Sequence, residues 1–477
     1  MSVRKKRILI ITGAIVLLFL IAAAAIIALI DINSYKAKIE SAASEAMGKE
    51  VIIKGRMGLS LFPFGIYARD ILVRNKEGDI LSVEKLHIGL ALVPLLKKQF
   101  RVREFELVRP SVTIVKDAAG RYNFERVGEK TVSGSTRTSF SINEIKLSHG
   151  VLVYLDKKTG NRTELKDLNV TINDLSTGST GEDTLMNISF AGKINCGEIR
   201  RKNLVIEKFR AEIKASKGIF NITPVTMDIF GGTAEGDITA DMSIRPESFK
   251  LNFKLIKFSF EKFYAALEKK MTIGGEGTIT ASLTAHGKDS RQIMQSLSGE
   301  FSLRGDNLSI RAMDIDKFIS KFEETQKFTF TDIGAFLIAG PLGMAASKGL
   351  SYGNVYLQTY GGPGIIRKLN SYWDIKDGVA DAADCALATE RNRVAIKGKL
   401  DLVNEIYNDL IVAILDDNGC SRFEQKISGP FSSPRIGAVS AVQSIGGPVL
   451  NLLTKAKSLV NGGKCEEFYH GSVQHPK

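Results

Sequence analysis

The sequence predicts a mainly β protein with short helices, in which an N-terminal transmembrane helix precedes a long run of antiparallel sheet. Two observations support this fold class. Residues 8–30 form an uncharged apolar stretch whose only polar side chain is Thr12. Residues 51–431 then carry hydrophobic side chains at alternate positions, with glycine-bearing turns between the runs. Such alternation sends one set of side chains to an apolar sheet face and the other set to a polar face.

The apolar stretch directly follows four basic residues, Arg4 to Arg7. A helix needs about 20 apolar residues to cross a bilayer, whereas the apolar region of a cleaved signal peptide has only about 7–15. Small residues at 22–25 could imitate a cleavage site, but the apolar run continues beyond them. We therefore expect an uncleaved anchor, which includes Ile8, Leu17, Leu18, Leu20 and Ile30. Basic flanks stay in the cytoplasm, so residues 31–477 are expected across the membrane.

The net charge of the chain is positive. It amounts to +13, of which the N-terminal cluster supplies four. A basic exported body is attracted to anionic phospholipid head groups, although lysines spread along strands also simply solubilise edges and outer faces. Nucleic acid is not expected as a partner, because no basic block follows the anchor.

The pattern divides the chain into five parts. These are a basic tip and anchor (1–30), a first β region (31–130), a middle β region (131–300), a last β region (301–436) and a helical segment with a tail (437–477). Helical spacing of apolar residues predicts short helices at 33–47, 260–270, 289–298, 315–327 and 438–459. A polar stretch at 133–139 indicates a linker or a long loop.

The β regions are too long for one ordinary open sheet. At one strand and turn per ~13 residues they would hold roughly 25–30 strands, and a sheet of that size curls or splits. One outcome is a trough with its apolar face inward, and the other is two sandwiches with filled cores. The periodicity of the sequence leaves both possibilities open.

No group of residues indicates catalysis or cofactor binding. Asp314 and Asp316 could pair as acid and base, but they fit better as caps of the helix that begins near residue 315. Lys348 follows Ser347, whereas a phosphate-binding loop requires glycine at that position. We therefore expect no catalytic residue, no cofactor and no enzyme activity.

A metal site is not expected either. Cys465, His470 and His475 recur at equal spacing and could begin a zinc site, but no fourth ligand is evident. His87, His149 and His286 stand singly among strand residues and are interpreted as surface or turn histidines.

The four cysteines suggest one disulfide. Cys420 lies in a turn before the last predicted strand, and Cys465 lies beyond the last helical segment, so a bridge would fasten that segment to the sheet. The Cα atoms of the pair should then be less than about 7 Å apart. Cys196 and Cys385 are interpreted as single buried thiols. Four unpaired cysteines remain the alternative.

Several segments resemble the AsmA family of bacterial envelope proteins. Near the N-terminus these are residues 31–36 (DINSYK), 48–55 (GKEVIIKG), 59–63 (LSLFP), 68–75 (ARDILVRN), 94–96 (PLL), 109–110 (RP) and 117–124 (DAAGRYNF). The family commonly has tryptophan where this chain has Phe124. In the C-terminal half the resembling segments are 297–299 (LSG), 314–316 (DID), 377–378 (DG), 391–402 (RNRVAIKGKLDL) and 429–430 (GP). The middle third fits the family only by its pattern.

The resemblance implies an architecture and a function. The family is similar to bridge-like lipid-transfer proteins, which favours an elongated, curled β-groove over two sandwiches. It implies an inner-membrane protein with residues 31–477 in the periplasm, which carries phospholipid acyl chains toward the outer membrane. Its partners would be membrane phospholipids, the inner membrane and an outer-membrane or other envelope protein. The candidate groove residues are Phe249, Leu251, Phe253, Leu255, Ile279, Leu283, Phe301 and Leu303. The alternative function is a non-enzymatic assembly or scaffolding factor for outer-membrane proteins.

Overall fold

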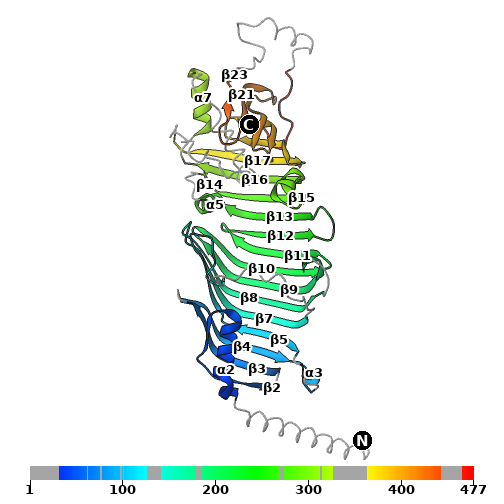
Figure 1. Ribbon diagram of the computed structural model, residues 1–477. Helices are drawn as coiled ribbons and strands as arrows, with labels where there is room; N and C mark the ends of the chain where they lie inside the picture. The colour runs from blue at the N-terminus through cyan, green and yellow to red at the C-terminus, as the bar shows by residue number, and fades with distance from the viewer. Residues whose placement is uncertain are drawn as a thin grey trace, which may run out of the picture. The chain divides into compact units, whose positions relative to one another are not determined.

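The computed structural model consists of two compact units, unit 1 (Met1–Arg201) and unit 2 (Lys202–Lys477) (Figure 1). It describes residues 32–61, 63–75, 78–96, 99, 101–125, 141–178, 184–267, 273–311, 314–325, 362–441 and 465–476. Each unit is built from hydrogen-bonded strands with a few short helices, which confirms the mainly β class. The five-part division of the sequence is finer than these two units and stays a prediction.

The anchor prediction concerns residues 1–30, which lie outside the described residues. Within the part of the chain that the structure describes, no helix combines the length and the apolar character needed to cross a membrane.

Unit 1 contains nine strands and four short helical segments among its described residues. The helical segments are η1 (Ile32–Tyr35, a 3-10 helix), α2 (Lys36–Met47), α3 (Leu92–Leu96) and α4 (Thr184–Asn187). The strands are β1 (Glu50–Ile53), β2 (Met57–Leu61), β3 (Phe64–Asn75), β4 (Gly78–Leu90), β5 (Val102–Val108), β6 (Ser111–Lys116), β7 (Ser141–Asp156), β8 (Asn161–Thr177) and β9 (Ile188–Arg201).

The sheet of unit 1 is mixed, which corrects the prediction of a purely antiparallel sheet. Strands β1 and β2 both pair with β3, and antiparallel pairing continues through β4 to β5 and β6. Both β5 and β6 then pair with β7 in parallel. The pairing is parallel because β7 begins at the same end of the strands as β5, so β5, β6 and β7 all run in one direction. The predicted linker at 133–139 falls between β6 and β7, outside the described residues.

Helix α2 covers the free edge of β1. The predicted helix at 33–47 is confirmed by η1 and α2, and Gly48 caps it with a φ of 62°. Its contact with the edge of β1 is polar, because Glu40 Oε1 and Ser44 Oγ accept hydrogen bonds from the backbone N–H groups of Ile53 (2.6 Å) and Val51 (2.9 Å). Unpaired N–H groups on an edge strand otherwise attract further strands. The helix therefore closes this edge.

Only part of the apolar surface of η1 and α2 faces the sheet. Ile32 and Ala43 pack against the core of unit 1, whereas Tyr35 of η1 and Ile39 and Met47 of α2 are 56%, 38% and 47% exposed. Glu40 and Ser44, which accept the hydrogen bonds from β1, lie on a different side of the helix from the exposed Ile39. These hydrogen bonds therefore decide how α2 is rotated about its axis.

Unit 2 contains fourteen strands and three helices among its described residues. The helices are α5 (Phe260–Ala266), α6 (Ser290–Gln295) and α7 (Ile315–Thr325). The strands are β10 (Leu204–Ser216), β11 (Ile219–Ile229), β12 (Gly232–Asp241), β13 (Ser248–Ser259), β14 (Ile273–Gly274), β15 (Glu276–His286), β16 (Ser298–Ile310), β17 (Gly364–Lys376), β18 (Val379–Ala388), β19 (Arg393–Asp401), β20 (Ile406–Leu415), β21 (Ser421–Pro430), β22 (Arg435–Ile436) and β23 (Ser440–Ala441).

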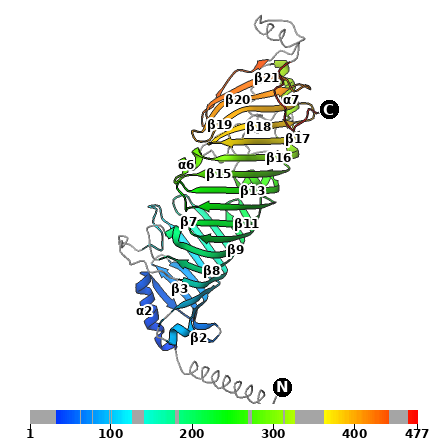
Figure 2. The same cartoon turned by 90° about the vertical axis from the view of Figure 1, so that its right-hand side faces the viewer.

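The strands of unit 2 form an antiparallel meander. Successive long strands pair from β10 to β13, then with β15, and onward from β16 to β21 (Figure 2). The short strand β14 pairs with β16, and both β22 and β23 pair with β21. Most neighbouring strands are joined by short connections and form local hairpins, whereas β16 and β17 are separated in sequence by residues 311–363, which include α7.

Three predicted helices occur in unit 2 with small corrections. In α5 the residues Phe260, Phe263 and Tyr264 are buried, whereas Leu267, directly after the helix, is 36% exposed. Asp314 caps α7 by accepting a hydrogen bond from Lys317 N at 3.1 Å.

The second predicted cap and the last predicted helix differ from expectation. Asp316 binds the side chains of Thr389 and Asn392 instead, which ties α7 to the turn between β18 and β19. The helix predicted at 438–459 is wrong at its start, because Ser440 and Ala441 form β23, and its other positions from 442 lie outside the described residues.

Bulges interrupt neighbouring strands at matching places. Arg109, His149 and Asp167 have φ values of 47°, 54° and 52°, in the left-handed region that ordinary side chains rarely adopt. They are neighbours: Arg109 N donates to Ser148 O (2.8 Å), and His149 Nδ1 lies 2.8 Å from Asp167 Oδ1. A bulge bends its strand and increases the local twist. A line of bulges therefore bends β5–β8 together.

The C-terminal tail packs against unit 2. Phe468, Tyr469 and Val473 are buried in a small cluster that also contains Ala386, Ala388, Ala395, Ala413 and Leu415. Arg393 Nη1 donates to Val473 O (3.2 Å), and the Tyr469 hydroxyl donates to Asp384. Tails are usually mobile, but this tail is held because the outer side of β18–β20 offers alanines that leave room for its rings.

A disulfide fastens the same tail. Cys420 and Cys465 are bonded with 6.1 Å between their Cα atoms, inside the expected limit of about 7 Å. Beside it, Phe468 N donates to Gly419 O at 2.8 Å. Cys196 and Cys385 are free and buried, as expected. Cys465 is therefore not available as a ligand for zinc.

We expect Cys465→Ser to destabilise unit 2 without unfolding it. The bridge closes a loop with a sequence separation of 45, which corresponds to about 4 kcal/mol of unfolded-state entropy in the simplest treatment. The packed rings of the tail should retain part of the native structure. Thermal unfolding under non-reducing conditions should show a lower Tm, and Cys196→Ser serves as a control that leaves the bridge intact. An unchanged Tm for Cys465→Ser would contradict a stabilising role for the bridge.

Candidate functional site: the apolar sheet face of unit 2

One face of the unit 2 sheet is apolar across many strands. In an antiparallel sheet, directly paired residues lie on the same face. The pairings place rows of apolar residues side by side on this face: Ile213, Ile222, Ile238, Leu251 and Leu283 in one row, and Val225, Gly236, Phe253, Ala281, Phe301 and Trp373 in the next. We call this surface the apolar face of unit 2.

All eight candidate groove residues lie on the apolar face. Phe249, Leu251, Phe253 and Leu255 alternate along β13, and their partners on β15 and β16 include Ile279, Leu283, Phe301 and Leu303. Their exposure differs. Leu255, Ile279, Phe301 and Leu303 are buried in the core, whereas Phe249, Leu251, Phe253 and Leu283 are half-buried. The half-buried four are the ones that can contact another molecule.

Large and small side chains alternate across these strands. Phe220 on β11 pairs with Ala240, which pairs with Phe249 on β13, which pairs with Ala285 on β15. A small residue between two rings leaves space for both when neighbouring strands curve toward each other. The alternation therefore suits the apolar face to the inner side of a bent sheet.

The opposite face of the same strands is polar. Asp237, Asn252, Ser282 and Glu300 are paired across β12, β13, β15 and β16. Their side chains form hydrogen bonds, with Asn252 Nδ2 donating to Asp237 (2.9 Å) and Ser282 Oγ donating to Asn252 (2.8 Å). This face is therefore suited to water, and the functional asymmetry of the sheet lies in its apolar face.

Helices α5 and α7 cover part of the apolar face. Phe263 of α5 packs edge-on against Phe230 with 5.1 Å between ring centroids, and it also contacts Phe258 at 5.4 Å. Ile315, Phe318 and Ile319 of α7 belong to the same core. Toward β16–β21 the apolar residues are buried, whereas those on β10–β13 are mostly half-buried. The accessible part of the apolar face therefore belongs to β10–β13 and β15.

Unit 1 has an apolar face of its own. Ile66, Ile88, Phe105 and Ile145 follow one another across β3, β4, β5 and β7. The neighbouring row contains Leu86, Leu107, Leu147 and Val170. The two units thus repeat one design, in which each strand contributes alternate side chains to an apolar surface.

Sequence reasoning missed the residues of β10–β12 on the apolar face. Ile213, Ile222 and Ile238 share a row with the predicted Leu251, and Ile238 is 37% exposed. A signal was present, since apolar residues alternate at Ile213 and Ala215 on β10 and at Phe220 and Ile222 on β11, and these strands reach β13 through β12. The pattern shows which residues share a face along one strand, but it does not give the register between strands.

The free thiols and the C-terminal histidines do not assemble into a reactive site within the described residues. Burial raises the pKa of the Cys385 thiol to about 12 and also raises the pKa of the Cys196 thiol. Both are therefore neutral thiols at physiological pH, and thiolates are the reactive form. His470 and His475 pair with Glu467 (3.0 Å) and Asp417 (3.3 Å).

The histidines in unit 1 differ from one another. His149 occupies a bulge, and its hydrogen bond lowers the pKa of Asp167. His87 was expected at the surface or in a turn, but it is 2% exposed in the middle of β4. The expectation for His87 was wrong because side chains on the neighbouring strands cover the polar face at this point.

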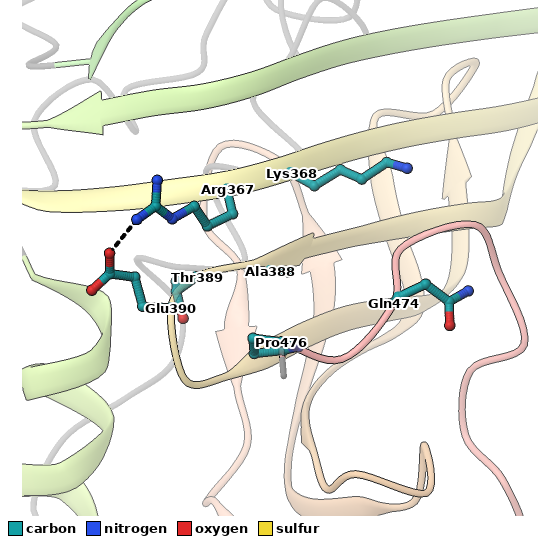
Figure 3. A pocket seen from close by; sticks show the side chains of 7 residues that line it. All are labelled: Arg367, Lys368, Ala388, Thr389, Glu390, Gln474 and Pro476. Carbon is teal, nitrogen blue, oxygen red and sulfur yellow. Dashed lines mark hydrogen bonds and ion pairs between the residues drawn. The ribbon is translucent and has the colours of Figure 1, made fainter.

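A pocket of about 540 Å³ lies beside the C-terminal tail (Figure 3). Its lining residues are Arg367, Lys368, Ala388, Thr389, Glu390, Gln474 and Pro476. The guanidinium of Arg367 turns toward Glu390, with Nη2 2.5 Å from Oε1. The positive charge of Arg367 is therefore compensated by Glu390 within the pocket.

Comparison with known proteins identifies the family. The model of the AsmA family matches residues 1–198 and 186–336, which include most of unit 1 and the part of unit 2 that carries the candidate groove residues. The chain belongs to the AsmA family. No curated protein and no solved structure gives a significant match.

The extent of the match refines the resemblance seen in the sequence. It covers the middle third of this AsmA-family protein, where the sequence showed only a pattern. It ends at residue 336, so the resembling segments at 377–378, 391–402 and 429–430 remain untested. A mainly β sheet architecture together with AsmA membership fits a bridge-like envelope protein.

Proposed function

We propose that this AsmA-family protein carries phospholipid acyl chains along its apolar sheet faces, from the inner membrane toward the outer membrane. The apolar face of unit 2 is the observation that supports this proposal. It presents half-buried Phe249, Leu251, Phe253 and Leu283 beside one another, while the other face is polar and hydrogen-bonded. A lipid lying there would keep its head group in water.

The energetics favour a continuous apolar surface over a closed pocket. Transfer of one methylene from water to an apolar environment is worth about 0.8 kcal/mol, so an acyl chain gains most when every carbon has an apolar neighbour. The rows of the apolar face satisfy this, because each paired position from β10 to β15 holds an apolar residue or glycine. A charge placed in a row would interrupt the path.

We expect Leu251→Glu and Phe253→Glu to reduce the amount of co-purified phospholipid roughly tenfold or more, because a carboxylate against an acyl chain is desolvated without a partner. Lipids extracted from the purified 31–477 fragment would be quantified by mass spectrometry. Lys250→Glu is the matched control, since Lys250 lies on the same strand and faces the polar side between Thr239 and Thr284.

Two results would contradict the proposal. One is a wild-type amount of lipid in both groove variants, provided that circular dichroism shows them folded. The other is an equal loss of lipid in the Lys250→Glu control, which would show that any added negative charge has this effect.

An assembly or scaffolding role for outer-membrane proteins is the alternative function. A polar sheet face with ordered hydrogen bonds could dock another envelope protein, and the basic net charge of +13 does not distinguish the two functions. Loss of particular outer-membrane proteins with an unchanged lipid distribution would favour this alternative.

The proposal includes a membrane anchor with a defined orientation. The apolar stretch 8–30 is long enough to span a bilayer, and Arg4 to Arg7 favour a cytoplasmic N-terminus. Residues 31–477 are then periplasmic, a compartment in which the disulfide between Cys420 and Cys465 persists.

We expect a reporter enzyme that is active only in the periplasm to be active when it is fused after Lys477. A second fusion, with a reporter that folds only in the cytoplasm, should be inactive. The opposite pair of results would overturn the orientation. Replacing Arg4 to Arg7 with glutamate should weaken the orientation, because the bias of basic residues sets it.

Unit 1 carries an exposed apolar patch that we assign to the membrane surface. Leu61, Leu92, Val93 and Val102 are 41%, 54%, 67% and 39% exposed at one end of β2–β5. The chain before α2 lies near the same short strand, because Asn33 of η1 is hydrogen-bonded to Met57 at the start of β2, and η1 follows the apolar stretch after only a few residues. An anchor that leaves the bilayer at residue 30 brings this end to the lipid head groups.

We expect a fluorophore that reports polarity to sense lipid when it is attached at Val93→Cys in the full-length protein in liposomes. The buried thiols of Cys196 and Cys385 should remain unlabelled. The emission should shift to the blue relative to Ile244→Cys, a position in unit 2 that is 46% exposed. Equal emission at the two positions would show that the patch does not touch the membrane.

A further inference from the structure

A buried histidine lies on the polar face of unit 1, the face of the sheet opposite the row of Ile66, Ile88 and Phe105. One of its ring nitrogens has no hydrogen-bond partner. His87 of β4 is 2% exposed, and its Nε2 is buried without a hydrogen-bond partner. Buried polar atoms in native proteins are almost always paired. This nitrogen therefore requires either a partner that binds from outside the chain or a protonated ring that pairs with a neighbouring carboxylate.

Two carboxylates surround the same histidine. Glu104 and Glu106 of β5 each offer an oxygen, and these oxygens and one ring nitrogen of His87 all lie within 4.8 Å of one another. The register explains the group, since Glu106 pairs directly with His87 and Glu104 pairs with Gly89 two residues further along β4. Both glutamates are half-buried, so the group is open to solvent on the carboxylate side.

Gly89 makes room for the first of these carboxylates. A Cβ at Gly89 would lie 2.9 Å from the Cβ of Glu104 and 3.5 Å from its Oε2. Without that atom, the Glu104 side chain can lie over β4 beside His87. On the other side, the Tyr67 ring leans away over Gly58, whose Cβ would meet the Tyr67 hydroxyl at 2.6 Å. The histidine thus faces the glutamates.

We propose that His87, Glu104 and Glu106 bind a divalent metal ion of the zinc class. An imidazole nitrogen with two carboxylate oxygens is a donor set that suits Zn²⁺, and solvent can complete the coordination. Ligand atoms around zinc lie roughly 3.3 Å apart, given bonds of about 2.0–2.2 Å. The three ligand atoms here lie within 4.8 Å of one another, so small rotations of the side chains would bring them to the distance that zinc requires.

The local charges are consistent with a bound cation. Lys85 Nζ forms an ion pair with Glu106 Oε2 at 3.8 Å. The ammonium of Lys85 compensates the charge of one carboxylate, and a divalent ion would neutralise the charge of the other. The ion would join β4 to β5 at the end of the hairpin that carries α3. The site lies on the polar face, so it is independent of lipid carriage.

The test measures zinc binding to the full-length protein in detergent after chelator treatment. Equilibrium dialysis with Zn²⁺ alone, followed by elemental analysis, should show one ion per chain. Glu104→Gln and Glu106→Gln should each weaken the affinity at least about tenfold, and His87→Gln should abolish the binding. Glu84→Gln is the matched control, because Glu84 is an exposed carboxylate on the same strand that pairs with Arg109 at 2.6 Å.

Three results would overturn the proposal. The first is the absence of zinc binding by the stripped wild-type protein. The second is unchanged zinc affinity in both glutamine variants. The third is zinc binding that disappears in a His470→Ala, His475→Ala double variant and survives Glu104→Gln, which would place the ion at the C-terminal tail. Folding of each variant would be checked by circular dichroism, and the glutamine variants at half-buried positions should preserve it.

Discussion

Successive side chains of a pleated strand point to opposite faces of a sheet, and both units of this protein depend on that constraint. Leu251 and Phe253 reach the apolar face of unit 2 because Lys250 and Asn252, between them, point to the other side. A shift of one residue in the register of β13 would exchange the two faces. The hydrophobic pattern and the hairpin turns therefore have to agree at every strand, and in unit 2 they do so through consecutive antiparallel pairs.

Two further features turn a flat sheet into a surface that could hold an acyl chain. In unit 1, aligned bulges such as Arg109, His149 and Asp167 bend neighbouring strands at the same level. In unit 2, the alternation of Phe220, Ala240 and Phe249 across strands leaves room for rings on the inner side of a bent sheet. Each feature thus suits the sheet of its own unit to curvature. Lipid carriage by an AsmA-family protein is consistent with both features.

A sheet with an accessible apolar face and free edges risks pairing with other chains. The structure limits this risk at the positions described. Helix α2 supplies Glu40 and Ser44 to the free N–H groups of β1, and the polar contact leaves Tyr35 and Ile39 exposed beside the predicted anchor. In unit 2 the tail covers the alanine side of β18–β20, and the disulfide holds it there. Helix α2 precedes the strands of unit 1 in the sequence, and the tail follows the strands of unit 2 that it covers.

The sequence by itself determined the mainly β class, the short helices at 33–47, 260–270, 289–298 and 315–327, and the set of residues that share a face along β13. These follow from local periodicity and from capping residues such as Gly48, which act within a few positions of the chain. The AsmA family was also recognisable from short segments. The single bridge between Cys420 and Cys465 was expected because a turn and a tail flank the same end of the predicted sheet.

Only the tertiary structure decided what depends on register and on contacts between distant segments. The parallel pairing of β5 and β6 with β7 follows from a return of the chain that no local pattern encodes. The rotation of α2 follows from the acceptors that β1 needs, and the row that joins Ile213 to Leu251 follows from the pairing of four strands. The group formed by His87, Glu104 and Glu106 has the same origin, because residues on separate strands become neighbours only once the register between those strands is fixed.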